Sequence, residues 1–268
     1  MAAIDSPPAE RALRSPVRNR YFYGKLLDVY HFQLETGYMN GKRHLLNRLI
    51  SGYGVVCGLD VQPGGDGRHV VVMPGVAIDK WGREIIVPEP SRRIPIPRHL
   101  LPAERPQERR EHGDGSERRE QDEPVVRVRL CYHECESDPT PVLAGDCGTV
   151  EECAAGAIRE RYRITFEEGG APRKRLHCRI PDLFHGDRLD YEALARHVSE
   201  DCPEPPRDPC ITLANVRLHG PGGHHCDPDR IDITVRPIVY TNDLLLEIVL
   251  SLLEEGREHR HAKDERGE

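Results

Sequence analysis

The sequence predicts a mainly β fold with flanking helices, an α+β chain whose strands form a β-sandwich or a barrel-like meander. Residues 52–87 hold three short runs rich in Val and Ile, separated by Gly and Pro, a pattern typical of a β-meander. Apolar and polar residues alternate again in residues 124–132 and 158–167, which favours further strands. The longest helical patterns lie near the two ends of the chain.

Length and composition limit the possible functions. A chain of 268 residues can bury a core in one large domain or in two small ones. The net charge of -7 leaves no basic footprint for nucleic acid. The sequence contains no run of about 18 apolar residues, so we expect no membrane span. The N-terminus lacks the apolar core of a signal peptide, and we therefore expect synthesis in the cytoplasm.

Residues 1–16 are rich in Pro and Ala and are predicted to be a disordered tail. Residues 17–101 are predicted to form a helix followed by the meander. Asp28 is expected to cap this helix, and Gly52 lies just past its end. Apolar residues at helical spacing indicate one packed face of this helix.

The first strand of the meander is expected to bury alternate residues, namely Val55, Cys57, Leu59 and Val61. On this interpretation Cys57 is a buried thiol that behaves as a small hydrophobe. One more edge strand is expected around Ile94 and Ile96, limited by its prolines.

Residues 102–123 contain no Leu, Ile, Val or aromatic residue and are predicted to be a disordered charged linker or insertion. Residues 124–254 are predicted to be a Cys-rich β region with a C-terminal helix. This region forms either a second domain or the remainder of the first β domain. Residues 255–268 are predicted to be a charged tail.

Within the second half, a Cys- and Pro-rich loop is expected to follow the first strand and to run to about Gly156. A short helix is expected at 191–198, and strands at 211–218 and 231–239.

The last helix is expected to begin at a cap, Asn242 or Asp243, and to end near Glu254. It is apolar nearly all round, so we expect it to be buried either in the fold or against a partner. Its predicted interface residues are Leu245, Ile248 and Leu252.

The N-terminal region carries a specific set of motifs. Phe22-Tyr-Gly-Lys-Leu-Leu leads into the helix, and Gly52-Tyr-Gly-Val-Val-Cys-Gly-Leu-Asp-Val follows it. Pro74-Gly-Val-Ala-Ile-Asp and Gly82-Arg-Glu-Ile come next. Over residues 20–90 this pattern resembles proteins encoded with phage-tail-like contractile injection systems and related tail or baseplate components. The resemblance implies a structural subunit, present in several copies, whose partners are other tail and baseplate proteins of a particle assembled in the cytoplasm.

Two aromatic residues of the meander are candidates for an interface. Trp81 lies in a Trp-Gly-Arg corner, and Trp and Arg are enriched at binding hot spots. Tyr53 is the nearest other candidate. Trp81 can equally cover the end of the sheet. The two residues also support an alternative function, a β module that binds a glycan or another cell-surface ligand.

The nine cysteines are the most specific chemical feature of the sequence. Apart from Cys57 they fall into two groups of four, each of which is a candidate for a structural zinc site because thiolate is a preferred zinc ligand. The first group is Cys131, Cys135, Cys147 and Cys153. The second is Cys178, Cys202, Cys210 and Cys226, with His224 and His225 beside the last and His177 and His219 nearby. Disulfides and free thiols are the alternatives.

The sequence contains no nucleophile elbow, phosphate-binding loop or dinucleotide fingerprint. We therefore expect no enzymatic activity and no catalytic residue, and no cofactor other than a structural zinc. A zinc-dependent enzyme is the remaining alternative, and it needs an open metal position with a nearby general base.

Overall fold

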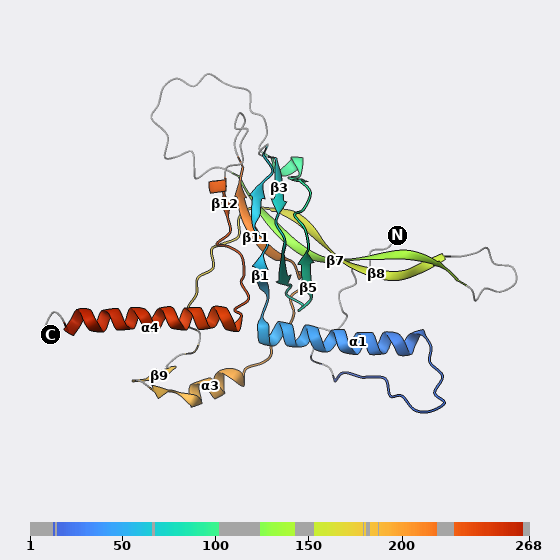
Figure 1. Cartoon of the computed structure of the whole chain (residues 1–268), viewed down its shortest axis with the longest axis horizontal. Helices are drawn as coiled ribbons and strands as arrows, with labels where there is room; N and C mark the ends of the chain where they lie inside the picture. The colour runs from blue at the N-terminus through green and yellow to red at the C-terminus, as the bar shows by residue number, and fades with distance from the viewer. Residues whose placement is uncertain are drawn as a thin grey trace, which may run out of the picture.

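The computed structural model describes residues 13, 15–65, 68–101, 124–142, 153–178, 180, 183–186, 188–218 and 228–264. The predicted insertion at 102–123 lies outside the described residues, as does nearly all of the predicted tail at 1–16. The fold is mainly β, with one helix near each end of the chain, as the sequence predicts (Figure 1).

The N-terminal helix α1 (Val29–Leu46) begins where the sequence predicts. The Asp28 carboxylate accepts a hydrogen bond from the backbone amide of His31 at 3.2 Å, and the His31 ring bonds back to the backbone of Asp28. This capping box satisfies donors that the first turn of a helix leaves free. One turn of π-helix, η1 (Asn47–Ser51), continues α1 to Gly52, whose φ of 77° is a conformation that glycine adopts without strain.

The predicted meander forms two small antiparallel sheets. The first has the order β1-β4-β5, with strands β1 (Gly54–Gly58), β4 (Gly75–Ile78) and β5 (Glu84–Val87). The second has the order β2-β3-β6, with strands β2 (Val61–Pro63), β3 (His69–Val72) and β6 (Ile94–Pro95).

The expectation that Cys57 is buried is wrong, because a register shift between Val55 and Cys57 interrupts the alternation of strand β1. Cys57 is exposed. Leu59, which follows with a left-handed φ of 57°, is fully buried instead.

The second half of the chain supplies a four-stranded sheet with the order β12-β11-β7-β8. Its strands are β7 (Val125–Pro141), β8 (Cys153–Glu168), β11 (Ile211–Arg217) and β12 (Ile231–Asp232). Strands β7 and β8 pair continuously from Val126↔Glu168 to Pro141↔Cys153, with one irregularity near Asp138. Within the expected loop, residues 133–141 and 153–156 are therefore strand, and residues 143–152 lie outside the described residues.

The predicted strand at 231–239 is wrong beyond its first two residues. The Asp232 carboxylate accepts hydrogen bonds from both the backbone amide and the hydroxyl of Thr234, which starts a turn. The chain then returns to the first sheet, where Ile238 forms an isolated parallel bridge with Val55.

The remaining elements are short, except for the last helix. They are η2 (Arg98–Leu100), β9 (Phe184–His185), β10 (Arg188–Leu189), α3 (Tyr191–Val198), η3 (Pro228–Arg230) and α4 (Asn242–Asp264). Helix α3 was expected from the sequence, and Asp190 caps it. In α4 the backbone amide of Leu244 donates to Thr241 Oγ1 at 3.2 Å, so Thr241 is the cap instead of Asn242 or Asp243. Helix α4 also runs past its predicted end at Glu254.

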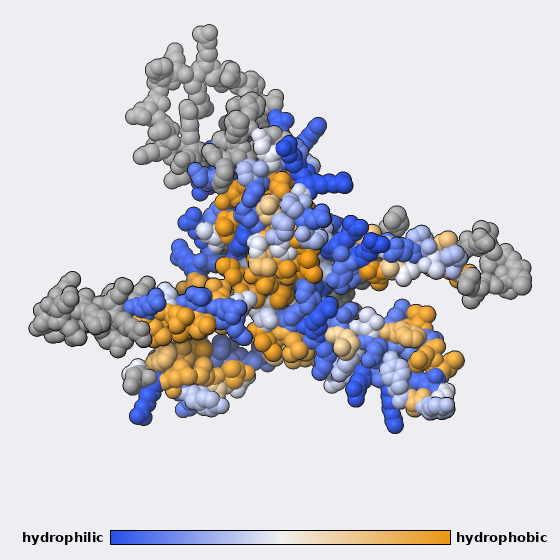
Figure 2. Space-filling view, in the orientation of Figure 1, coloured by the Kyte–Doolittle hydropathy of each residue, from blue (hydrophilic) through white to orange (hydrophobic). Residues whose placement is uncertain are grey.

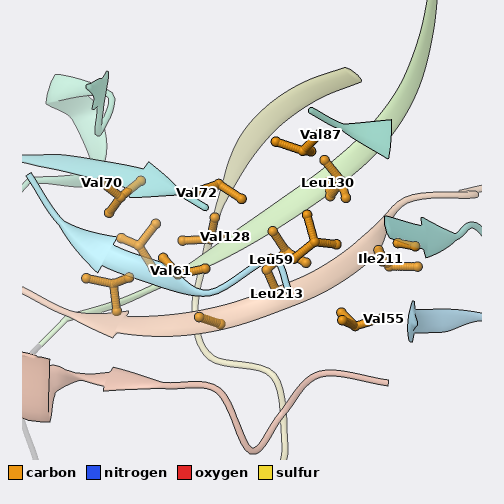
Figure 3. Close-up of a cluster of buried hydrophobic side chains, with 14 of the residues drawn as sticks. Val55, Leu59, Val61, Val70, Val72, Val87, Val128, Leu130, Ile211 and Leu213 are labelled. Carbon is orange, nitrogen blue, oxygen red and sulfur yellow. The ribbon is translucent and has the colours of Figure 1, made fainter. Parts of the chain in front are cut away.

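Both halves of the chain contribute to one hydrophobic core. The side chains of the first two sheets lie against those of β7 and β11 (Figure 3). Fully buried residues include Leu59, Val70, Val72, Val128, Leu130, Ile211 and Leu213. The first two sheets, the inner parts of β7 and β8, and β11 therefore pack as one β body around a shared interior.

Three elements project from this β body (Figure 1). Helices α1 and α4 extend in opposite directions from the lower end of the β body in this view. The outer parts of β7 and β8 form a two-stranded arm. None of the described side chains of α1 or α4 is buried. The core thus comes from the sheets, and the two terminal helices contribute none of its buried residues.

Two neighbouring residues of β5 test this description of the core. Ile85 is 1% exposed, whereas Ile86 is 60% exposed. We expect Ile85→Ala to lower the free energy of unfolding by about 2–5 kcal/mol, because it removes buried methylene groups and leaves a cavity. The matched control Ile86→Ala should stay within about 0.5 kcal/mol of the native chain. Urea unfolding measures both, and equal losses would contradict this account of the core.

Candidate functional site

The turn between β4 and β5, Asp79–Arg83, is the junction at which several segments of the chain meet. The Asp79 carboxylate is fully buried and accepts hydrogen bonds from the backbone amides of Trp81 at 2.8 Å and Arg83 at 2.9 Å. The Arg83 guanidinium binds the same carboxylate through Nε and Nη2, both at 2.7 Å. A buried charge is tolerated when its partners satisfy it in this way.

Arg83 also connects the turn to the four-stranded sheet. Its guanidinium carbon lies 4.6 Å from the ring centre of Trp81 and 4.4 Å from that of Tyr132, which is within range of cation–π attraction. The Tyr132 hydroxyl donates to Glu134 at 2.8 Å. Burial, together with this hydrogen bond, raises the pKa of Tyr132. Tyr132 therefore stays protonated and continues to donate.

The C-terminal end of α1 packs on the same turn. Asn47 Nδ2 donates to the carbonyl oxygen of Gly82 at 2.9 Å and to Glu84 Oε1 at 2.7 Å. A Cβ atom at Gly82 would lie 2.0 Å from the carbonyl oxygen of His44, and the φ of Gly82 is 90°. Glycine is therefore required here both for space and for conformation. Burial lowers the pKa of His44, which favours the neutral ring in this contact.

A loop that precedes β11 forms the other side of the junction. The Trp81 indole N–H donates to the carbonyl oxygen of Pro206 at 2.7 Å, and the Lys80 amide donates to that of Pro209 at 3.1 Å. Asp208 pairs with Arg129 of β7 at 2.5 Å and with Lys80 at 3.6 Å. The ring and the N–H of Trp81 are thus both engaged within the chain.

The same loop ends in a disulfide between Cys131 and Cys210, whose Cα atoms lie 4.5 Å apart. Their neighbours Leu130 and Ile211 are paired across β7 and β11, so Cys131 on β7 faces Cys210, the residue directly before β11. The predicted zinc set is not formed in this arrangement. Cys131 bonds to a cysteine of the other predicted group, and a disulfide sulfur is no thiolate ligand.

The other members of the first predicted set lie apart. Cys135 is four residues beyond Cys131 along the same strand, about 13 Å away at strand spacing. Cys153 lies at the outer end of β8, where it pairs with Pro141. Cys147 lies outside the described residues. Sequence spacing could not reveal the disulfide, because β7 and β11 become neighbours only in the folded sheet.

The structure describes only part of the second group of cysteines. Cys178 and Cys202 are exposed free thiols, and His177 is exposed as well. Cys226 and the neighbouring His219, His224 and His225 lie outside the described residues. Among the residues that the structure describes, no group of three or more His, Cys, Asp or Glu side chains is placed to hold a metal ion.

The predicted interface residues of α4 lie at the surface. Leu245, Ile248 and Leu252 are 45%, 39% and 63% exposed. The alternative that this helix is buried within the fold is therefore wrong. Tyr53 is also partly exposed, and the Lys174 ammonium lies 5.9 Å from its ring centre.

A second apolar surface, the N-terminal surface of residues 21–32, has no counterpart in the sequence-based interface predictions. It consists of side chains more than half exposed, namely Tyr21, Phe22, Tyr23, Leu26, Val29, Tyr30 and Phe32. Figure 2 shows hydrophobic side chains along α4 and at the outer end of α1. The dense aromatic cluster at 21–23 is the sequence signal for this surface.

The arm formed by β7 and β8 carries opposite charges on its two faces. Directly opposed residues of an antiparallel pair share a face. Glu134 and Glu160 face each other on one side, and His133 and Arg161 on the other.

No protein-family model matches the chain, and a search of curated proteins found no match. Within the described part of the chain, no helix is both long and apolar enough to cross a membrane.

The buried ion pair of the junction can be tested with a matched exposed pair. We expect Asp79→Ala to lower the free energy of unfolding by about 3–5 kcal/mol, because it leaves the Arg83 guanidinium with no counter-charge in a site that is only 18% exposed. Glu192→Ala breaks the exposed pair with Arg196 on α3 and should cost less than about 0.5 kcal/mol. Chemical denaturation measures both. A loss below 1 kcal/mol for Asp79→Ala would show that the junction does not depend on this pair.

The pairing of Cys131 with Cys210 leads to a separate prediction. Its loop spans 79 residues of sequence, so breaking it should reduce stability by about 2–4 kcal/mol through the larger entropy of the unfolded chain. We expect Cys131→Ser and Cys210→Ser to lower the melting temperature equally, with no further loss in the double variant. Cys178→Ser serves as the control and should have no effect. Unequal single losses, or additive ones, would contradict the pairing.

Proposed function

We propose that the chain is a structural subunit of a contractile injection system or a related phage-tail-like particle, at the baseplate or at a point of fibre attachment. The observation that carries this proposal is the pair of terminal helices, which leave their apolar side chains uncovered on a cross-linked β body. The partners are neighbouring tail and baseplate proteins, and several copies are present in each particle. Assembly takes place in the cytoplasm.

The size of the uncovered surface supports an assembly role. Monomeric soluble proteins seldom expose a contiguous apolar patch larger than a few hundred Å². Covering one Leu, Ile or Val side chain contributes about 1.5–3 kcal/mol. Seven residues of α4 in the stretch 245–253 are each at least 39% exposed, and the N-terminal surface adds seven more. A partner that covers these residues gains a large driving force for association.

The rigidity of the β body also supports an assembly role. The shared core, and the contacts of the β4–β5 turn with Tyr132 and Pro206, join both halves of the chain into one unit. A rigid unit loses little conformational entropy on docking, which strengthens assembly. Formation of the disulfide suits a particle that is released by lysis, because the cytoplasm keeps thiols reduced and the exterior does not.

The glycan-binding alternative receives less support. It relies on Trp81 and Tyr53 as an exposed aromatic patch. The Trp81 ring stacks on Arg83, and its N–H bonds to Pro206. Tyr53 is 39% exposed, but the Lys174 ammonium lies 5.9 Å from its ring centre.

Incorporation into particles tests the proposal. We expect the chain to co-sediment with tail-like particles from cells that produce them, and particles from cells lacking it to be incomplete by electron microscopy. The variant Tyr30→Glu with Phe32→Glu should reduce incorporation, because it places two charges on the N-terminal surface. Gln33→Glu, also exposed on α1, is the matched control and should incorporate normally. Complete particles that lack the chain would contradict the proposal.

A further inference from the structure

We propose that the open edge of β8 binds an extended strand of a partner protein, one whose acidic side chains alternate along its length. The outer part of β8 belongs to the arm, which projects from the β body (Figure 1). Strand β8 is the last strand of its sheet, and it pairs only with β7 among the residues that the structure describes. An open edge of this kind is a template for a further strand. This site is separate from the two terminal helices on which the proposed function rests.

The register of β8 on β7 shows which backbone groups face the open edge. The amide of Gly169 donates to the carbonyl oxygen of Val125 at 2.9 Å, so these two residues form a hydrogen-bonded pair. The same register continues from there to Ser137↔Ala157, so the odd-numbered residues of β8 bond to β7. The residues that direct their N–H and C=O groups to the open edge are therefore Ile158, Glu160 and Tyr162. None of these groups bonds to a described backbone group.

The side chains along this edge make one face of the arm basic. Arg159, Arg161 and Arg163 alternate along β8, so they share one face, and all three are exposed. Arg159 pairs with Asp138 at 3.0 Å. Arg163 Nη2 lies 3.2 Å from Nδ1 of His133, and neither Arg161 nor Arg163 has a carboxylate partner among the described residues. This face therefore keeps uncompensated positive charge, although the net charge of the chain is -7.

Cross-strand pairing determines what the partner strand must carry. Directly opposed residues of two paired strands share a face, with Cβ atoms about 4.5–5.5 Å apart. Side chains at every second position of the partner strand repeat about every 6.8 Å, which is also the repeat of the three arginines. Acidic residues at these positions face the arginines in turn, and opposite charges in this arrangement stabilise the pairing. The positions between them face Ile158, Glu160 and Tyr162, where Thr and Val suit a strand.

A second copy of β8 fits this edge poorly. An antiparallel pair centred on Glu160 places Arg159 opposite Arg161. A pair centred on Arg161 places Arg159 opposite Arg163. A pair centred on Tyr162 places Arg161 opposite Arg163. Like charges directly opposite each other destabilise a sheet, so the arginines favour a partner strand of different sequence.

A nucleic acid also fits this edge poorly, although arginine binds phosphate well. Glu134 and Glu160 face each other on the other face of the arm, and Glu136 lies on that face as well. These carboxylates repel phosphates that approach the edge. A nucleic acid has no regular row of amide and carbonyl groups, so it would leave the open backbone groups of β8 without strand pairing. An acidic strand satisfies both the backbone groups and the arginines.

Binding of a synthetic peptide to the purified full chain tests this site. The probe is a fluorescent peptide of about nine residues in which Glu alternates with Thr and Val, long enough to pair along the open edge. We expect saturable binding by fluorescence anisotropy. The same peptide with Gln in place of Glu should bind at least about tenfold more weakly, because it loses three charge pairs.

Methylation of the peptide backbone tests strand pairing separately from charge. Only alternate N–H groups of a paired strand point to its neighbour. Two forms of the Glu peptide are therefore compared, each with N-methyl groups on one alternate set of residues. One form should bind at least about tenfold more weakly than the unmethylated peptide, because its methyl groups block the hydrogen bonds to β8. The other form should bind normally, because its methyl groups point away from β8.

Two variants of the chain test the same contacts. Arg161→Glu with Arg163→Glu should weaken binding of the Glu peptide at least about tenfold, whereas Arg175→Glu with Arg188→Glu alters the net charge equally at exposed positions and should not. Ile158→Pro removes an amide that faces the open edge and no bond to β7, so it should weaken binding about two- to tenfold. Ile158→Thr keeps this amide and serves as its control. Unchanged thermal unfolding should show that each variant folds.

Several results would overturn the inference. Absence of binding of the Glu peptide at about 1 mM would do so. Equal binding of the Glu and Gln peptides would show that the arginines do not select the partner. Equal binding of the two methylated forms would show that the peptide does not add as a strand. Tighter binding of a single-stranded oligonucleotide of equal charge would assign the arginines to nucleic acid. Dimers of the chain that Ile158→Pro disrupts would assign the edge to a second copy.

Discussion

The buried carboxylate of Asp79 is the constraint on which the rest of the structure depends. Its two backbone amides and the Arg83 guanidinium fix the conformation of the β4–β5 turn. The end of α1, the loop before β11 and the ring of Tyr132 all contact this turn. A charge buried in an interior of low polarity is costly unless all its partners are present. Loss of one partner of Asp79 therefore destabilises the other contacts of the turn. The nearby disulfide links Cys131 of β7 to Cys210, directly before β11, beside the same junction.

This organisation divides the chain into a β body that holds the hydrophobic core and two terminal helices that contribute no buried residue to it. The sheets bury Val, Ile and Leu side chains almost completely, whereas α1 and α4 bury none of their described residues. Most of the stability of a helix in a protein comes from packing of its apolar face. We propose that α1 and α4 gain such packing from a partner. This distribution of apolar surface is the basis of the proposal that the chain docks through its two terminal helices.

Local signals in the sequence were sufficient to predict the start of α1 and several strands. The Asp28 capping box marks the start of α1, and alternation marks β7, β8 and β11. Some predictions failed at local hydrogen bonds, such as those of Thr234 to Asp232, and others failed where the outcome depends on residues distant in sequence. The bulge that exposes Cys57 arises from the register with β4, and the partner of Cys131 comes from a strand 79 positions away. The exposure of α4 also depends on the tertiary structure, since its apolar pattern fits equally well a helix inside the core and a helix against a partner. The interface residues were therefore predictable as apolar helix positions, but their accessibility was not.

Hydrogen exchange on the purified chain and on the chain within assembled particles tests the central claim most directly. The account predicts that backbone amides of α1 and α4 exchange rapidly at low concentration and become protected on assembly, because partner contacts then hold these helices. Amides of the β body, such as those of Val128 and Leu213, should be protected in both states because they lie in the shared core. Full protection of α1 and α4 in the dilute single chain would contradict the account, since it would mean that the helices are held by their own β body.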